Sequence, residues 1–206
     1  MSAVKFLLAK TVCEKTASHY DKLIDENNDP VRDPLLLKEY MDKWDGQRFL
    51  DSLRLSPDKD VLEIGVGTGR LAIRVCGGCN TFTGIDISPK TIERGRVNLH
   101  HFNNCTLICA DFMEYEFDKT FDVVYSSLTF IHIADKSRAI KKTSELLRRN
   151  GRFVLSVGKS QDKYLGELEL FPVSPDEIKR MFCEAALTVE NFFETEFAFV
   201  VVGIRQ

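Results

Sequence analysis

The sequence predicts an α/β fold: a Rossmann-like, seven-stranded and mostly parallel sheet flanked by helices, with an antiparallel last strand. Apolar, strand-like runs alternate with helical segments from residue 59 to about 185, which is typical of a parallel sheet covered by helices. The first run leads directly into a glycine-rich segment, as the first strand of such a sheet does. The link between the last two runs is too short for a crossover helix, which indicates an antiparallel pair.

Local signals place the individual elements. Strands are expected, in chain order, at 60–64, 81–85, 106–110, 121–126, 152–157, 188–194 and 198–204. Helices are expected at 69–75, 88–99, 135–149 and from residue 174. Ser88 is a suitable N-cap, and Ser174 with Glu177 has the spacing of a capping box. Asn150 and Gly151 are typical of a helix end.

The first 58 residues differ in character from the alternating region. They predict two helices, at about 4–27 and 34–53, joined by a turn around Asn27–Pro30. We interpret residues 1–58 as a helical cap on the core formed by residues 59–206. A chain of 206 residues suits one domain of this kind.

Composition excludes several classes of function. Apolar residues make up 44% of the chain, yet no apolar run approaches the ~20 residues that span a bilayer. We read neither a signal peptide nor a membrane anchor, and expect a cytoplasmic protein. The net charge of −3 gives no overall attraction to nucleic acid. The pair Cys76 and Cys79 lacks a second pair for a zinc site and is interpreted as ordinary reduced thiols.

A glycine-rich loop is the strongest functional signal. Gly65, Gly67 and Gly69 follow the first strand, where a backbone without β-carbons can turn sharply against a ligand. Asp86 lies 21 positions after Gly65 at the end of the next strand, and an acidic residue there can accept both hydroxyls of a ribose. The sequence therefore predicts a nucleoside-bearing ligand at this edge of the sheet.

Two residues favour S-adenosylmethionine (SAM) over a dinucleotide. Arg70 stands where the dinucleotide fingerprint has its third glycine. Glu63 precedes the loop, and its carboxylate would repel a pyrophosphate but attract the ammonium and sulfonium groups of SAM. An NAD-dependent oxidoreductase is therefore disfavoured.

With these residues in place, the chain resembles the class I SAM-dependent methyltransferases over residues 59–204. The segments that are similar to successive family motifs are 61–70, 84–88, 110–112, 121–127 and 151–155. The resemblance implies that SAM is the cofactor and that the cofactor-binding residues are Glu63, Gly65, Gly67, Gly69, Asp86, Ile87, Asp111, Phe112 and Ser126.

The resemblance also implies a role for each part of this set. Glu63 and the glycines would lie beside the methionine part, and Ser126 would offer its backbone carbonyl to the ammonium group. Asp86 would hold the ribose, and Asp111 the adenine amino group. Glu63 and Asp111 could each instead cap nearby backbone.

Two residues are candidates for catalysis. A base is needed only if the methyl acceptor is still protonated at neutral pH, as a hydroxyl group is. His132 follows the fourth strand, near which such enzymes place groups that face the substrate, and histidine titrates near neutrality. Tyr20, followed by Asp21, resembles the N-terminal element that folds over SAM in small-molecule methyltransferases. Packing roles are the alternative for both residues.

The sequence narrows the acceptor without identifying it. Ser126-Ser127-Leu128-Thr129 differs from the motif that grips a planar amide or a base amino group, and no RNA-binding module is visible. The favoured function is methylation of a small molecule, without nucleic acid, membrane or metal. A SAM-binding regulatory or scaffolding protein, or a methyltransferase acting on protein or RNA, is the alternative. The oligomeric state is open.

Overall fold

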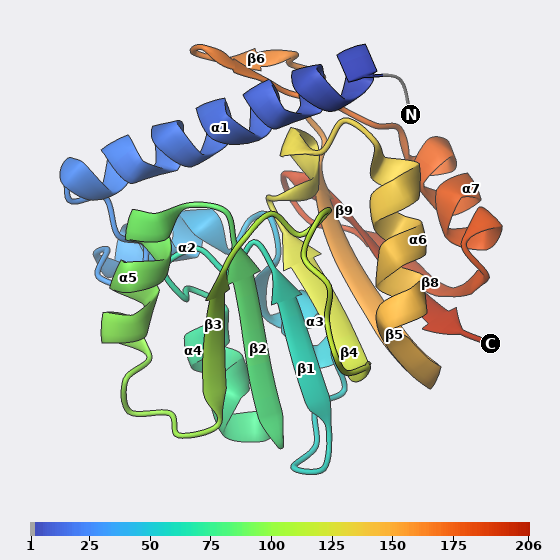
Figure 1. Cartoon of the computed structure of the whole chain (residues 1–206). Helices are drawn as coiled ribbons and strands as arrows, with labels where there is room; N and C mark the ends of the chain where they lie inside the picture. The colour runs from blue at the N-terminus through green and yellow to red at the C-terminus, as the bar shows by residue number, and fades with distance from the viewer. Residues whose placement is uncertain (1–2) are drawn as a thin grey trace.

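A seven-stranded sheet forms the centre of the protein (Figure 1). The computed structural model describes residues 3–206, with side chains from residue 11 onward. The strand order is β3-β2-β1-β4-β5-β9-β8. The strands are β1 (Asp60–Ile64), β2 (Thr81–Asp86), β3 (Cys105–Cys109), β4 (Phe121–Ser127), β5 (Leu147–Gly158), β8 (Leu187–Glu194) and β9 (Ala198–Arg205). Strands β1 to β5 pair in parallel, whereas β9 runs antiparallel to both β5 and β8. The predicted fold class is confirmed.

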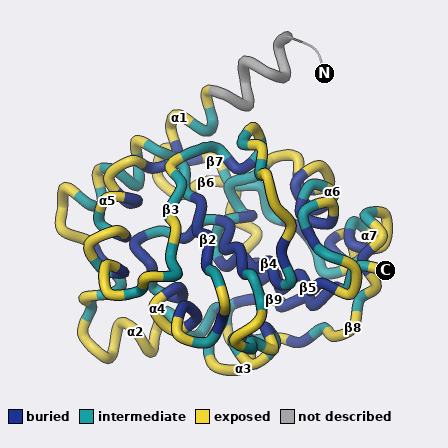
Figure 2. Tube along the Cα trace, turned by 60° about the horizontal axis from the view of Figure 1, so that its bottom comes forward, coloured by how far each residue is buried: buried dark blue, intermediate teal, exposed yellow. Residues whose placement is uncertain are grey.

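Helices cover both faces of this sheet because neighbouring side chains of a strand point to opposite sides. Val61 of β1 belongs to one buried cluster and Leu62 to another. The first cluster is covered by α3 (Gly46–Ser52), α4 (Ala72–Val75) and α5 (Pro89–Asn98). The second is covered by α6 (Lys136–Leu146) and α7 (Pro175–Glu184). Figure 2 shows the buried residues concentrated in the central strands.

The N-terminal helix crosses the end of the sheet where the parallel strands finish (Figure 1). Helix α1 (Ala3–Asp25) runs over the tips of β1, β2 and β4, and the small hairpin of β6 (Tyr164–Leu165) and β7 (Leu168–Glu169) lies beyond it. Between β4 and α6, the short 3-10 helix η2 (Phe130–His132) lies at the same end. None of the described helices is both long and apolar enough to cross a membrane.

The prediction of a single helix at 34–53 is wrong. The structure has α2 (Leu35–Met41) and α3, separated by a break at Asp45 and Gly46. Gly46 adopts a φ of +69°, which is outside the right-handed helical region, and the Asp45 carboxylate caps α3 by accepting a hydrogen bond from the Gly46 backbone nitrogen. Helix α2 contains no buried residue, and it is exposed along its length (Figure 2).

Two other expected helices are shorter in the structure. Helix α4 spans only four residues and continues into the 3-10 helix η1 (Cys76–Gly78). Helix α6 ends at Leu146 rather than 149, because the fully buried Leu147 already pairs with Phe121 as the start of β5. The chain then bulges through Asn150, whose φ is +63°, before Arg152 resumes the pairing.

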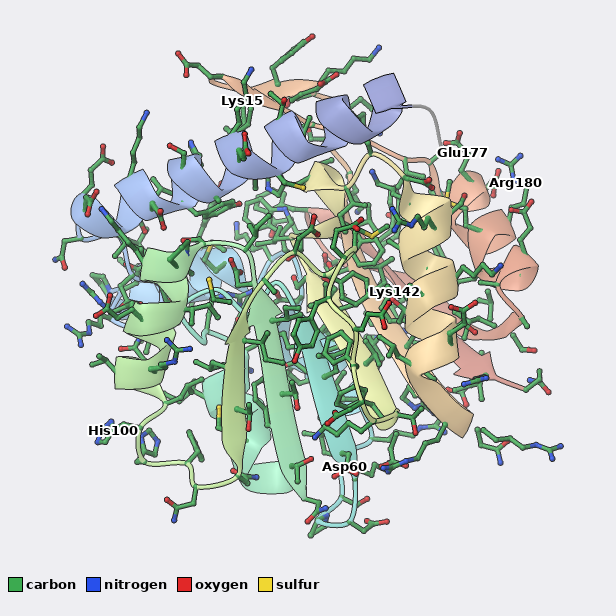
Figure 3. All side chains as sticks on the ribbon, in the orientation of Figure 1. Lys15, Asp60, His100, Lys142, Glu177 and Arg180 are labelled. Atoms are coloured by element: carbon green, nitrogen blue, oxygen red, sulfur yellow. The ribbon has the colours of Figure 1, made fainter. Side chains whose placement is uncertain are left out.

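The bulge carries the ion pairs at the opposite end of the sheet from α1. The Arg148 guanidinium contacts Asp60 Oδ2 at 2.7 Å and Asp122 Oδ2 at 2.5 Å. Figure 3 shows Asp60 at the end of β1 that is distant from α1. These charges belong to the base of the sheet, whereas the predicted site residues lie at the other end.

Candidate functional site

A large cavity lies at the carboxyl ends of β1, β2 and β4, with α1 along one side. Its volume is about 1350 Å³, which exceeds the ~300–1,000 Å³ typical of a site for one small ligand. The glycine loop, the ends of β2 and β3, the segment after β4, and α1 all contribute. Of the predicted site residues, the cavity is lined by Tyr20, Glu63, Gly65, Gly67, Asp86, Ile87, Asp111, Phe112 and His132. Gly69 and Ser126 are not among its lining residues.

The glycine loop forms an open cradle. Gly65 donates its backbone N–H to the Ile85 carbonyl oxygen at 2.8 Å, which ties the loop to β2. Gly67 lines the cavity with a φ of +56°, and a β-carbon built there would meet no atom within 4 Å. The space beside Gly67 is therefore open for a ligand that approaches the backbone closely.

Gly69 serves helix packing. Its φ is +97°, and a β-carbon there would lie 3.0 Å from Leu99 Cδ1 at the end of α5. Ser126 is fully buried and donates its hydroxyl to the Ile64 carbonyl oxygen at 2.8 Å, so its side chain joins β4 to β1. Ser127 is the neighbour that lines the cavity.

Asp86 lies between the loop and α5. Its Oδ2 accepts from the Gly67 backbone nitrogen at 3.0 Å and its Oδ1 accepts from the Ser88 backbone nitrogen, also at 3.0 Å. Burial raises the pKa of Asp86, although these backbone donors oppose the change. Ser88 caps α5 and also donates its hydroxyl to Asp21 of α1 at 2.6 Å. The tip of β2 is thereby connected to the helix that covers it.

Glu63 is a buried carboxyl group on the floor of the cavity. It is 3% exposed and accepts a hydrogen bond from the Tyr125 hydroxyl at 2.7 Å. Burial raises its pKa well above the usual range, since nearby charges and the tyrosine compensate only partly for lost hydration. A cationic ligand group would restore the missing compensation. Tyr125 lies in the motif-like segment 121–127, but sequence reasoning did not name it among the site residues.

Asp111 caps nearby backbone and also lines the cavity. Its Oδ1 accepts from the Met113 backbone nitrogen at 2.8 Å, as a turn cap, while the carboxyl group also lines the cavity. Its Oδ2 accepts from the Cys13 thiol of α1 at 3.3 Å. Phe112 is 6% exposed and lines the cavity beside it.

Tyr20 and His132 form a pair across 112 residues of sequence. The Tyr20 hydroxyl lies 3.0 Å from His132 Nε2 and joins α1 to η2. Burial lowers the pKa of His132 to about 4 and raises the pKa of Tyr20 to about 12, so both groups are neutral at pH 7. His132 Nδ1 is buried without a hydrogen-bond partner in the described part of the chain.

A second connection, which the sequence did not reveal, joins the N-terminal segment to the loop. The Asp45 carboxylate is fully buried and receives both terminal nitrogens of Arg70, with Oδ1 to Nη1 at 3.1 Å. The Ser127 hydroxyl also donates to Asp45, at 2.7 Å. No sequence motif marks Asp45, because it precedes the loop by 20 residues and lies in the break between two helices.

Within residues 3–206, no three His, Cys, Asp or Glu side chains that the structure describes are arranged to hold a metal ion. His100 lies exposed at the far end of α5, distant from α1 (Figure 3). Cys76 and Cys79 are both free and buried, which agrees with their interpretation as ordinary thiols.

Comparison with known sequences assigns the core. Residues 61–151 match the family model of the methyltransferase domain. An uncharacterized methyltransferase from a Geobacillus species is 26% identical over 94% of this chain and 96% of its own length. One from Anoxybacillus flavithermus is 32% identical, covering 58% of this chain and 57% of its own. The 27-O-demethylrifamycin SV methyltransferase of Amycolatopsis mediterranei is 32% identical over 70% of this chain and 59% of its own length. The chain thus spans less than two thirds of several of these relatives.

Solved structures share the fold at low identity. A chain in the complex of the Haloferax volcanii Trm112 methyltransferase activator with a putative methyltransferase has a TM-score of 0.73 and 17% identity, over 90% of this chain and 96% of that one. Magnesium protoporphyrin IX methyltransferase from Synechocystis with bound SAM has a TM-score of 0.61 and 19% identity, over 73% and 71%. N-methyltransferase NodS from Bradyrhizobium japonicum with S-adenosyl-L-homocysteine has a TM-score of 0.65 and 19% identity. The match covers 77% of this chain and 85% of that one.

The family match defines the central part of the chain: residues 61–151 are a methyltransferase domain, and the seven-stranded sheet that contains them has the fold of the SAM-dependent methyltransferases compared above. This domain contains the loop, Asp86 and Asp111. Two of the solved neighbours contain SAM or its product S-adenosyl-L-homocysteine.

Proposed function

We propose that the chain transfers the methyl group of SAM to a small-molecule acceptor held between the sheet and α1. The observation that carries the proposal is one cavity of about 1350 Å³ that contains the glycine loop, Glu63 and Asp86 at one side and Tyr20 with His132 at another. This volume leaves room for a second molecule beside a nucleoside cofactor.

The residues present fit SAM. The open cradle at Gly67 can accept a ligand against the backbone, and Asp86 offers a carboxylate to ribose hydroxyls. The carboxylate of Glu63 is buried, and a nearby cation such as the ammonium group of SAM would stabilise its charged form. Asp111 and Phe112 are suited to the adenine ring. Ser127 replaces Ser126 as the cavity-lining residue at the end of β4.

The protein's own contribution to the reaction is orientation and exclusion of water. Bound SAM supplies an electrophilic methyl group, so the enzyme chiefly aligns the acceptor. Helix α1 covers the cavity and brings Tyr20 to His132. Since His132 is neutral at pH 7, its ring can accept a proton from the Tyr20 hydroxyl as an acceptor releases one to that oxygen. Its low pKa makes it a weak base, which suits an acceptor that loses its proton easily.

The relatives support a small acceptor without identifying it. The 27-O-demethylrifamycin SV methyltransferase and a Caenorhabditis elegans sterol 4-C-methyltransferase, 28% identical over 55% of this chain, both carry small-molecule names. The Haloferax neighbour forms a complex with a methyltransferase activator. A methyltransferase acting on protein or RNA stays the alternative. Residues 1–58 as a cap on a single domain, and the cytoplasmic location, stay predictions.

Two measurements test the proposal. Calorimetric titration should show SAM and S-adenosylhomocysteine (SAH) binding to the purified chain while NAD does not. Incubation with radiolabelled SAM and fractionated metabolites should then move label into a small-molecule fraction. SAM binding without transfer to any fraction would favour a regulatory protein, and absence of binding would refute the proposal.

A further inference from the structure

The cavity contains little positive charge. Arg70 and Arg138 are the two Lys or Arg residues among the described residues that line it, whereas carboxyl groups are numerous. Arg138 belongs to α6 and pairs with Glu114 at 3.2 Å, near the end of β3. Arg70 directly follows the glycine loop, close enough to Glu63 for the two charges to interact. Arg70 is therefore the cation at the side of the cavity where Glu63 lies.

The methionine part of SAM carries two opposite charges, an ammonium and a carboxylate. Glu63 complements the first but would repel the second. An arginine beside it supplies the missing complement, since a guanidinium binds a carboxylate through parallel N–H groups. Asp45 occupies two of the five N–H groups of Arg70. The guanidinium therefore keeps donors for another carboxylate.

We propose that Arg70 binds the α-carboxylate of SAM and that the buried Asp45 is the positioning residue that holds Arg70 for it. This inference rests on the proposed binding of SAM. Asp45 is fully buried and is fixed from three directions, by Arg70, by Ser127 and by the Gly46 backbone nitrogen.

Of the two aspartates beside Arg70, Asp45 makes the close contact and Asp42 makes only a distant one. Its Oδ1 lies 3.6 Å from Arg70 Nη1, at the outer limit of an ion pair, and its side chain is 40% exposed. A solvated pair of this kind contributes little. Asp42→Asn is therefore a matched control for Asp45→Asn, because both remove one negative charge beside the same arginine.

The test compares two ligands that differ at the methionine end. SAH carries the amino acid part, whereas 5′-deoxy-5′-methylthioadenosine keeps the nucleoside and lacks the charged groups. We expect Asp45→Asn to weaken SAH binding by about tenfold or more, as measured by calorimetry, and to change methylthioadenosine binding less than about twofold. Asp42→Asn should leave both affinities within about twofold of the wild type.

A cycle of variants separates positioning from structural damage. If Asp45 acts through Arg70, the double variant Asp45→Asn with Arg70→Gln should bind SAH no more weakly than Arg70→Gln alone. Arg70→Lys keeps the charge but loses the planar fork, and should also lower SAH affinity selectively. That second variant decides the matter if Asp45→Asn fails to fold.

The outcomes distinguish this inference from the proposed function. If the wild type binds neither SAH nor methylthioadenosine, the proposed function fails and the inference with it. If the wild type binds SAH but the Asp45 and Arg70 variants weaken both ligands equally, or neither, the proposed function stands and the assignment of the carboxylate to Arg70 is overturned.

Discussion

The substitution Gly67→Ala should weaken cofactor binding at least tenfold at only a modest cost in stability. Gly67 has a φ of +56°, and an alanine in this left-handed region costs about 1–2 kcal/mol. No protein atom lies within 4 Å of the new methyl group, so packing adds nothing to that cost. The methyl group would instead stand in the cavity, where we expect the cofactor to approach the backbone. Loss of even 1.4 kcal/mol of binding free energy corresponds to tenfold in Kd.

Gly69→Ala is the matched control from the same loop. Its φ of +97° carries a comparable conformational cost, and its methyl group would lie 3.0 Å from Leu99 Cδ1. Overpacking of this kind adds about 1–3 kcal/mol. Because Gly69 does not line the cavity, the folded Gly69→Ala protein should bind SAH within about twofold of the wild type.

Urea denaturation measures the first effect and calorimetric titration with SAH the second. The expected result is a crossed pattern. Gly67→Ala loses only about 1–2 kcal/mol of stability but binds SAH at least tenfold more weakly. Gly69→Ala loses more stability, because overpacking adds to the conformational cost, but binds normally. Wild-type affinity in Gly67→Ala would refute the placement of the cofactor at this loop. Impaired binding by folded Gly69→Ala would refute the distinction between the two glycines.

Three further outcomes are expected. The pKa of His132 lies near 4 when folded and near 6.5 when unfolded, so the unfolded chain alone takes up this proton as pH falls from 6.5 to 4. Between pH 7 and pH 4.5, the wild type should thereby lose about 2 kcal/mol more stability than His132→Gln, as measured by urea titration. Equal losses would contradict the shift. Tyr20→Phe leaves His132 Nε2 without its partner and should lower the free energy of unfolding by about 1–3 kcal/mol. An unchanged free energy of unfolding would mean that the contact is weak. Glu63→Gln removes a buried charge but can keep the Tyr125 hydrogen bond, so the melting temperature of the ligand-free protein should rise while SAH binding weakens. Normal SAH affinity would exclude Glu63 from the site.

Features encoded by near neighbours in sequence could be predicted. The Ser88 hydroxyl accepts from the Thr91 backbone nitrogen, and Ser174 with Glu177 forms the expected capping box. The meeting of Asp86 with the glycine loop was also predictable, because Glu63 and Gly84 lie in register on adjacent parallel strands and the ends of those strands must coincide.

Contacts between distant segments could not be predicted from local pattern. Tyr20 and His132 were recognised separately, yet their pairing depends on how α1 docks across the sheet. Asp45 carries no periodic or motif signal, and its role follows from the break at Gly46 that turns its carboxylate toward Arg70. The end of α6 was misplaced because pairing of Leu147 with Phe121 overrides the helix-end signal of Asn150.

The attachment of α1 has a consequence for turnover. Asp21 bonds to the Ser88 cap of α5, and Asp25 pairs with Lys90 at 2.6 Å, so the end of α1 is fastened to the same helix that follows the Asp86 turn. Cys13, nearer the start of α1, adds a contact to Asp111, which follows β3. If the chain has the proposed function, we expect exchange of spent cofactor for fresh to require loosening of this helix, which is held at two separated places. We expect departure of the product, rather than the chemical step, to limit the rate of each cycle.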